Sequence, residues 1–230
     1  MATTQGLSEA EAAGVPSPEA GNGDGERPKR ADARRNRELL ITAARTVFGD
    51  QGAGAPMEAI AKEAGVGVGT LYRHFPNRLD LVEAVYETDV QVLAATARQV
   101  VAELEPGPAV DAFFDAFVRY ARTKQALLGE LQQAFEKHPD LRSRCRDLIE
   151  FSFDLVIERA KEAGAIRTDI SGSDVMSLVA PVCTNSSISA DQAERLTGMI
   201  LDGLRVGATA TATATATPAA TPTVAAPASA

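Results

Sequence analysis

Hydrogen-bond donors that suit phosphate gather in one short stretch, AGVGVGTLYRHFPNR, from Ala64 to Arg78. The donors are hydroxyl, phenol, guanidinium and imidazole groups, on Thr70, Tyr72, Arg73, His74 and Arg78. All of them can bind phosphate oxygens; Arg73 can also reach a guanine edge, and a threonine methyl can lie on a thymine methyl. Gly67, Val68 and Gly69 precede them, where the start of a helix would direct backbone N–H groups toward an anion. These residue types favour a contact with the phosphates and base edges of nucleic acid.

The same stretch has a simpler interpretation, which the sequence leaves open. A Gly-Val-Gly-Val-Gly run also suits an ordinary loop, and Tyr72 could belong to the core. Charge favours the nucleic-acid interpretation: residues 27–80 carry ten Lys and Arg against six Asp and Glu, in a chain whose net charge is −8. A local basic face can bind phosphate even in an acidic protein. The segment RPKRADARRNR could lie along a nucleic-acid backbone or be a solvated linker.

Three helices are predicted around this stretch. Apolar residues first repeat with helical spacing at Leu40, Ala44, Val47 and Phe48. A second helix is expected over 57–64, with Pro56 in its first turn and Gly65 ending it in the left-handed conformation that commonly follows a helix. A third helix covers 68–74, and Pro76 stops it because a residue before proline is disfavoured in a helix.

Two short helices joined by a tight glycine-containing turn form a helix-turn-helix. Leu71 and Phe75 lie four residues apart and are expected to point into the core, whereas Val68 and Tyr72 share a different face. The third helix therefore takes the place of a recognition helix, and Gly69 omits a side chain where that helix would meet DNA.

Helical periodicity continues through the rest of the chain. Asn77 is the expected N-cap of a fourth helix, roughly 38 Å long at 1.5 Å per residue. Later helices are predicted after the Pro-Gly-Pro turn at 106–108 and over about 127–137, 139–163, 173–187 and 190–205. Ser173 and Ser189 are the expected N-caps of the last two, and Ser189 forms a capping-box pattern with Gln192. No segment shows the alternation of a strand, so the fold class is all-α, with about nine helices.

The span from Asn36 to Val82 resembles the N-terminal DNA-binding domain of TetR-type transcriptional regulators. The resemblance rests on the combination A-A…F, G, I-A…A-G-V and G-T-L-Y-R-H-F, followed by a basic residue three positions after Phe75. It implies a three-helix DNA-binding head, a larger helical body that binds a small ligand, and a dimer formed by the last two helices. The implied partners are a double-stranded DNA operator, a second copy of the chain and an unknown small molecule.

The resemblance also assigns roles within the head. Thr70, Tyr72, His74 and Arg78 occupy DNA-contact positions, and Val68 and Gly69 lie where base-reading residues usually lie. Two departures are the Ala-Pro pair at 55–56 and Gly67, where many members have Ser or Thr caps. Each lost cap removes about 1 kcal/mol, although glycine at an N-cap loses only a few tenths. Val68 and Gly69 offer little hydrogen-bonding chemistry, so specificity would rest on Thr70, Arg73 and DNA shape.

Two residue groups in the body are candidates for the ligand and the dimer. Five phenylalanines suit either an apolar ligand cavity or plain core packing: Phe113, Phe114, Phe117, Phe135 and Phe151. A stripe on the last predicted helix suits either a partner helix or packing within the chain: Leu196, Met199, Ile200 and Gly203. The acidic balance of residues 81–230 leans away from strongly anionic ligands.

Four regions follow from this organisation: a disordered N-terminal arm over 1–33, the helix-turn-helix DNA-binding domain over 34–80, the helical ligand-binding and dimerisation domain over 81–206, and a disordered Ala/Thr/Pro tail over 207–230. The function expected is a homodimeric repressor that a small molecule releases from its operator. The alternative is a DNA-binding activator, or a regulator controlled by a protein partner, which predicts a filled rather than a hollow body.

Other function classes find little support in the sequence. There is no Ser/His/Asp set, no metal-spaced histidine cluster and no phosphate-binding glycine loop after a strand, so we expect no enzyme, metal or cofactor. Cys145 and Cys183 are expected to be free and buried. No apolar run approaches the ~20 residues of a membrane span, and no signal-peptide centre is found, so the expected location is cytoplasmic, without a membrane partner.

Overall fold

The computed structural model describes residues 26–52 and 54–205, and only the backbone of residues 26–30. This part of the chain contains nine α-helices and no strand, which confirms the all-α prediction. The chain divides into two compact units, 1–35 and 36–230, and the description below concerns the second. The predicted disorder of the two termini lies outside the described residues, apart from residues 26–33.

Helix α1 (Glu26–Gln51) begins within the predicted arm. Its first residues, ERPKRADARR, are mostly good helix formers, and Pro28 lies in the first turn, where proline is tolerated. Helical propensity therefore outweighs the polar composition that suggested disorder. In the second unit, Leu40, Ala44 and Phe48 of this helix are fully buried, as their spacing predicts.

Helices α2 (Met57–Glu63) and α3 (Val68–His74) complete the head. The turn between them includes Gly65 at φ 68°, in the left-handed region where glycine carries no steric cost. Gly67 is the N-cap of α3, without a side-chain hydrogen bond. The predicted helix-turn-helix is therefore present, with bounds within one residue of those expected.

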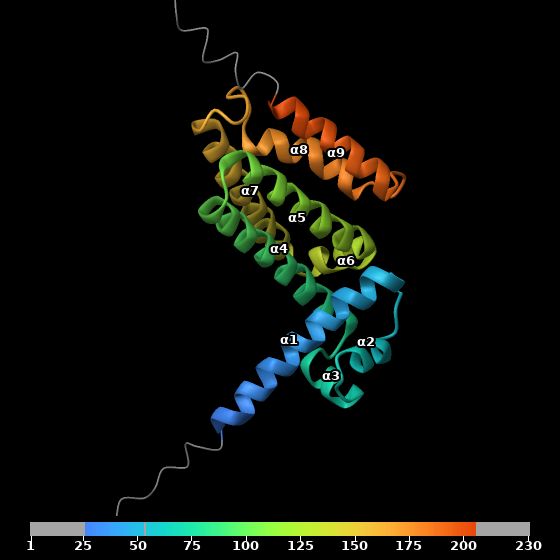
Figure 1. Cartoon of the computed structure of the whole chain (residues 1–230). Helices are drawn as coiled ribbons and strands as arrows, with labels where there is room; N and C mark the ends of the chain where they lie inside the picture. The colour runs from blue at the N-terminus through green and yellow to red at the C-terminus, as the bar shows by residue number, and fades with distance from the viewer. Residues whose placement is uncertain (1–25, 53, 206–230) are drawn as a thin grey trace, which may run out of the picture. The chain divides into compact units, whose positions relative to one another are not determined.

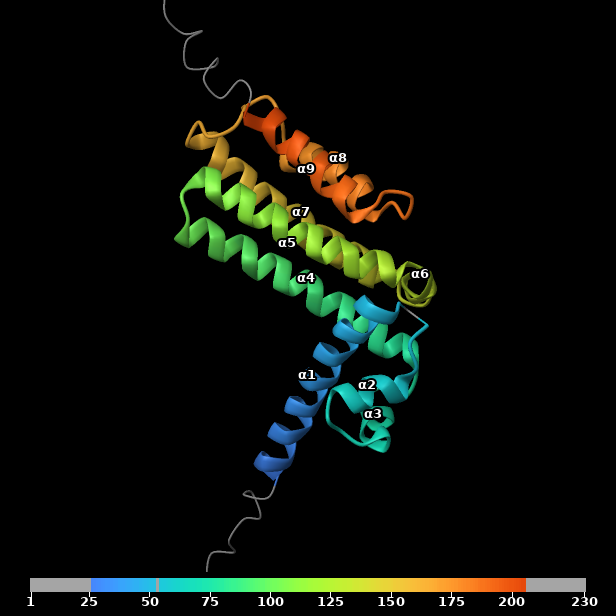
Figure 2. The same cartoon turned by 45° about the vertical axis from the view of Figure 1, so that its right-hand side comes forward.

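The body contains six helices: α4 (Arg78–Glu103), α5 (Pro106–Ala126), α6 (Leu128–Lys137), α7 (Pro139–Glu162), α8 (Gly172–Thr184) and α9 (Ala190–Arg205). Figures 1 and 2 show α4, α5 and α7 running side by side, with α8 and α9 paired along α5 and α7. The short helix α6 packs against α4 and α7. One continuous apolar core extends from Leu40 in the head to Leu204 in α9.

Polar side chains cap three helices of the body, α4, α8 and α9. The Asp80 backbone N–H donates to Asn77 Oδ1 at 3.0 Å, which confirms the predicted cap of α4. The N–H of Gln192 donates to Ser189 Oγ at 3.3 Å at the start of α9. The prediction of Ser173 as the cap of α8 is wrong: Ser171 caps this helix two residues earlier.

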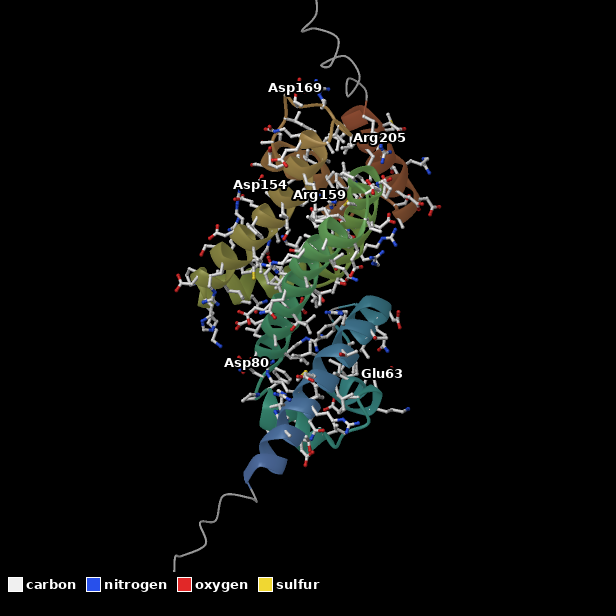
Figure 3. The ribbon with its side chains drawn as sticks, turned by 60° about the vertical axis from the view of Figure 1, so that its left-hand side comes forward. Glu63, Asp80, Asp154, Arg159, Asp169 and Arg205 are labelled. Carbon is white, nitrogen blue, oxygen red and sulfur yellow. The ribbon has the colours of Figure 1, made fainter. Side chains whose placement is uncertain are left out.

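Ser171 takes this place because a carboxylate stands three residues after it. The Asp174 N–H donates to Ser171 Oγ at 3.1 Å, and the Ser171 N–H donates to an Asp174 carboxylate oxygen at 2.9 Å. This reciprocal capping box satisfies two helix-terminal donors at once. Gly172 follows it and lies against α7, where a Cβ would come within 2.6 Å of the Asp154 backbone nitrogen; Figure 3 labels Asp154.

Candidate nucleic-acid interface and body pocket

Helix α3 presents two different faces, as the sequence predicts. Leu71 is 0% exposed, and Phe75, directly after the helix, is 2% exposed; both belong to the core. On the other face, Val68 is 39% exposed and Tyr72 is 42% exposed. A valine and a tyrosine left in solvent beside a complete core form a surface that is available to a partner.

The donors on this helix have no competing partner among the described residues. Arg73 is exposed, and Thr70 and His74 are half-buried. Among the residues that the structure describes, no hydrogen bond or ion pair engages the side chains of Tyr72, Arg73 or His74. These groups remain free to donate to phosphate oxygens or base edges.

Gly67 and Gly69 are not required by the packing of the head. A Cβ built at either position meets no atom of the described chain within 4 Å. The backbone at Gly67 has φ −68°, a value that any residue can adopt. The interior of the protein therefore gives no reason for these glycines, and they leave the N-terminal end of α3 bare.

Arg78 points into the protein and fits a positioning role better than the phosphate contact that the sequence suggests. Its Nη1 donates to the Ala55 carbonyl oxygen at 2.6 Å, and its Nε lies 3.8 Å from Glu130 of α6. The guanidinium also lies over the Phe48 ring, 5.0 Å from the centroid. One side chain thus ties together α1, the loop before α2, the start of α4 and α6.

Arg37 is a candidate that residue-by-residue reasoning missed. The sequence indicated the whole basic segment before the first predicted helix without choosing a member. The Arg37 guanidinium lies over the Phe75 ring, 5.4 Å from the centroid. This contact places an exposed positive charge of α1 beside the C-terminal end of α3.

The body contains a pocket of about 520 Å³ between α4, α5, α6, α7 and α8. Phe135, half-buried on α6, is the one member of the predicted aromatic set that lines it. Phe113, Phe114 and Phe117 instead pack around Phe153, with ring centroids 4.9 to 6.1 Å from it. These rings are buried core, so their contacts favour packing over a role as pocket wall.

Phe151, the fifth aromatic candidate, lies on the surface of α7. It is 48% exposed, and the Arg98 guanidinium lies 5.6 Å from its ring centroid. It does not line the body pocket. The polar side chains that do line the pocket come from five separate helices, so no spacing in the sequence identifies them.

Helix α6 is a wall of the pocket and is also bound to the first turns of α4. Besides the pair between Arg78 and Glu130, the Lys137 Nζ lies 3.6 Å from an Asp80 carboxylate oxygen. His138, directly after α6, lies 3.7 Å from Glu83. Figure 3 places Asp80 at the start of α4, where α4 follows α3. These ion pairs join α6 to the first turns of α4.

A second link joins the head to the body. Arg45 of α1 forms an ion pair with Asp89 of α4, which is 8% exposed. Burial raises the pKa of Asp89 to about 6, although the positive charge of Arg45 acts in the opposite direction. Tyr120 of α5 lines the same small pocket.

The two last helices each leave a large apolar side chain in solvent. Met199 of α9 is 69% exposed and Leu178 of α8 is 57% exposed, the two highest values among the large apolar side chains that the structure describes. The predicted stripe lies partly here: Gly203 is exposed, whereas Leu196 and Ile200 are half-buried. Ile200 also packs against the core, so it serves the inner face of α9.

The described residues contain no group of three or more His, Cys, Asp and Glu that could hold a metal ion. Cys145 and Cys183 are free and buried, as expected. Burial raises the pKa of the Cys145 thiol to about 11, and Glu87 adds to this effect. The thiol therefore stays protonated and unreactive near neutral pH. Among the same residues, no helix is long and apolar enough to cross a membrane.

Two family models match the chain. The one described as "Bacterial regulatory proteins, tetR family" matches residues 40–85. The one described as "Transcriptional regulator SbtR-like, C-terminal domain" matches residues 105–206. The first match contains the C-terminal part of α1, α2, α3 and the start of α4, and the second covers α5 to α9 completely.

Solved structures resemble the fold over most of its length. A TetR transcriptional regulator from Streptomyces coelicolor aligns with a TM-score of 0.66 and 38% identity, over 74% of this chain and 98% of that one. The TetR transcription regulatory protein from Mycobacterium vanbaalenii aligns with a TM-score of 0.62 and 32% identity, over 77% and 99%.

Curated relatives match a shorter part. One HTH-type transcriptional regulator of Staphylococcus aureus is 32% identical over 103 residues, which is 44% of this chain and 54% of that protein. Another is 38% identical over 72 residues, 31% of this chain and 39% of that protein. The chain therefore spans about half or less of the curated relatives that it matches.

Proposed function

The chain belongs to the TetR family of bacterial regulatory proteins, and from this premise we propose that it is a homodimeric repressor released from its DNA operator by a small molecule. The observation that carries the DNA-binding part is the bare face of α3. Val68 and Tyr72 are exposed there, and within the described part of the chain a Cβ at Gly69 would meet no atom within 4 Å and the donors of Arg73 and His74 have no partner.

Each residue of this face has a distinct task in the proposed complex. The N-terminal end of α3 enters the major groove, and the absence of side chains at Gly67 and Gly69 allows the backbone to approach the bases closely. Tyr72 and His74 donate to phosphates, and Arg73 reaches either a phosphate or a guanine edge. Arg37 adds a phosphate contact from α1. Arg78 holds the head in the orientation that these contacts need.

A homodimer through α8 and α9 would cover the exposed apolar side chains of these two helices. Leu178 and Met199 are the anchors of this proposed interface, and Gly203 allows a close approach of the partner helix. Two copies of α3 would then enter successive major grooves, so the operator would be a near-palindrome with half-sites about one helical turn or a little more apart.

Release by a small molecule is supported by the position of α6. Leu128 and Phe135 of α6 line the pocket. Glu130 and Lys137 of the same helix form ion pairs with the start of α4. A ligand that moves α6 would shift α4 and separate the two heads. Couplings of this kind amount to about 1–3 kcal/mol, or a factor of about 5 to 150 in DNA affinity.

Two experiments test this proposal. Selection of duplexes from a random pool by the purified chain should enrich an inverted repeat, and enrichment of no common sequence would remove the operator-binding function. Light scattering after chromatography should give the mass of a dimer at micromolar concentration. Met199→Asp should shift the dimer toward monomer, whereas Val92→Asp, at an exposed valine of α4, should not. A wild-type monomer with and without DNA would contradict the dimer.

The alternative is a DNA-binding regulator that activates transcription or answers to a protein partner. It is less supported because the pocket of about 520 Å³ lies within the range of roughly 300–1,000 Å³ that small-molecule sites occupy. A compound screen by thermal shift, followed by DNA release, distinguishes the two. Binders that leave DNA affinity unchanged would favour the alternative.

A further inference from the structure

The lining of the body pocket contains three cations and no carboxylate. Lys124 of α5 and Arg142 and Arg146 of α7 are three of its twelve lining residues, and none of the twelve is Asp or Glu. Arg146 Nε donates to Glu150 at 2.7 Å. In the part of the chain that the structure describes, Lys124 and Arg142 have no ion pair. This lining is opposite in sign to the acidic body around it, where residues 81–230 carry 13 Lys and Arg against 20 Asp and Glu.

Lys124 is the innermost of the three cations. It is half-buried, and its ammonium group lies 5.8 Å from the centroid of the Tyr86 ring. Burial lowers the pKa of Lys124, and the positive charge of Arg142 lowers it further. Both effects mean that the charged form of this lysine is destabilised as long as no anion is present. The negative charge of an anion beside it would offset both.

The rest of the lining is mostly apolar. Six side chains form this part: Leu128, Phe135, Ile149, Met176, Ala180 and Pro181. Tyr86, Gln132 and Ser177 add neutral hydrogen-bonding groups. An inorganic anion would leave the apolar wall without a partner, and a purely apolar molecule would leave the cations unpaired. The cationic part and the apolar part of the lining together fit a molecule with an anionic end and an apolar end.

We propose that this pocket binds an amphipathic carboxylate, with its head group between Lys124 and Arg142 and its apolar body against α6 and α8. The proposal rests on the proposed function only for its regulatory meaning, because it names the class of small molecule that would release the repressor. The binding itself is a separate property of the pocket and is tested separately.

Three probes with the same ten-carbon body test the head group. Decanoate, decan-1-ol and decylammonium are titrated below their aggregation limits into the full chain and its variants, by calorimetry. Lys124→Met keeps the length and the apolar stem of the side chain and removes the charge. Arg142→Gln is a second variant at an exposed position, which avoids a burial defect. Arg122→Gln is the matched control, because it removes an exposed charge of α5 that does not line this pocket.

The wild-type chain should bind decanoate about tenfold or more tightly than decan-1-ol, as expected for a charge-assisted hydrogen bond, and should bind decylammonium least. Lys124→Met and Arg142→Gln should each weaken decanoate binding by about tenfold and leave decan-1-ol binding within about twofold. Arg122→Gln should change neither. Equal binding of the three probes, no binding of decanoate at millimolar concentration, or equal loss in the control would overturn the inference.

A DNA assay separates this inference from the proposed function. If decanoate binds with the expected selectivity and leaves operator affinity unchanged, the pocket assignment holds and release by a ligand fails. If a cationic or neutral compound releases the operator and decanoate does not bind, release by a ligand holds and the carboxylate assignment fails.

Discussion

Gly69→Ala should raise the stability of the protein and lower its affinity for DNA. A Cβ at this position meets nothing within 4 Å, and the residue lies in the first turn of α3, so the folded state has room for a methyl group. Replacing a helical glycine by alanine stabilises the folded state by about 0.5–1 kcal/mol, and less near a helix end. In a chain of this size, that change raises Tm by about 1–4 °C.

The effect on DNA binding has the opposite sign because the methyl group would occupy the space that the bases need. We expect operator affinity to fall by about tenfold, or about 1.4 kcal/mol. Thermal unfolding gives the first quantity, and fluorescence anisotropy with a labelled operator gives the second. Because both are measured on one variant, loss of DNA binding cannot be attributed to a damaged fold.

Gly49→Ala is the matched control. Gly49 is an exposed residue of α1, and a Cβ there also meets nothing within 4 Å. It should give a similar rise in Tm and leave DNA affinity unchanged. If Gly69→Ala bound the operator as tightly as the wild type, the bare N-terminal end of α3 would not be the part of the helix that approaches DNA.

Three further substitutions test the structural account. Ser171→Ala should lower the free energy of unfolding in urea by about 0.5–2 kcal/mol through loss of the capping box, whereas Ser173→Ala should change it little; equal effects would contradict the cap. Gly172→Ala should cost about 1–3 kcal/mol, since the new Cβ would lie 2.6 Å from the Asp154 nitrogen; an unchanged urea midpoint would refute this close approach. Burial raises the pKa of Asp89 to about 6. The contribution of this carboxyl group to the free energy of unfolding is therefore present in full below about pH 4 and is lost as the pH rises through 6. The free energy of unfolding of Asp89→Asn should therefore exceed that of the wild type by up to about 3 kcal/mol at pH 8 and by little at pH 4. An equal difference at both pH values would count against the raised pKa.

The head could be predicted in detail because local signals agree there. Gly65 and Pro76 mark the ends of two short helices, and the spacing of Leu71 and Phe75 identifies their inner face; the structure has all of these features. Arg78 shows the limit of such reasoning. Its position relative to Phe75 matches a contact motif, but its partners, Ala55 and Glu130, lie 23 and 52 residues away in the sequence.

The body could be predicted as helices but not as a site. The clustering of phenylalanines in the sequence does not distinguish core residues from residues that line a pocket. In the structure Phe113 belongs to the core, whereas Phe135 lines the pocket. The positive charge of the pocket could not be predicted from the sequence either. Lys124 and Arg142 stand on different helices within an acidic stretch, and the folded arrangement of α5 and α7 is what brings them to one pocket.

The measurement that tests the central claim most directly is operator affinity of Tyr72→Ala, compared with the wild type and with Phe151→Ala over a range of salt concentrations. Tyr72 and Phe151 are aromatic side chains of similar exposure, 42% and 48%, on α3 and on α7. Loss of one phosphate contact should weaken specific binding by about tenfold for Tyr72→Ala, with a steep salt dependence in all three proteins. Phe151→Ala should match the wild type. Equal affinity of Tyr72→Ala and the wild type would contradict the claim that the exposed face of α3 binds DNA.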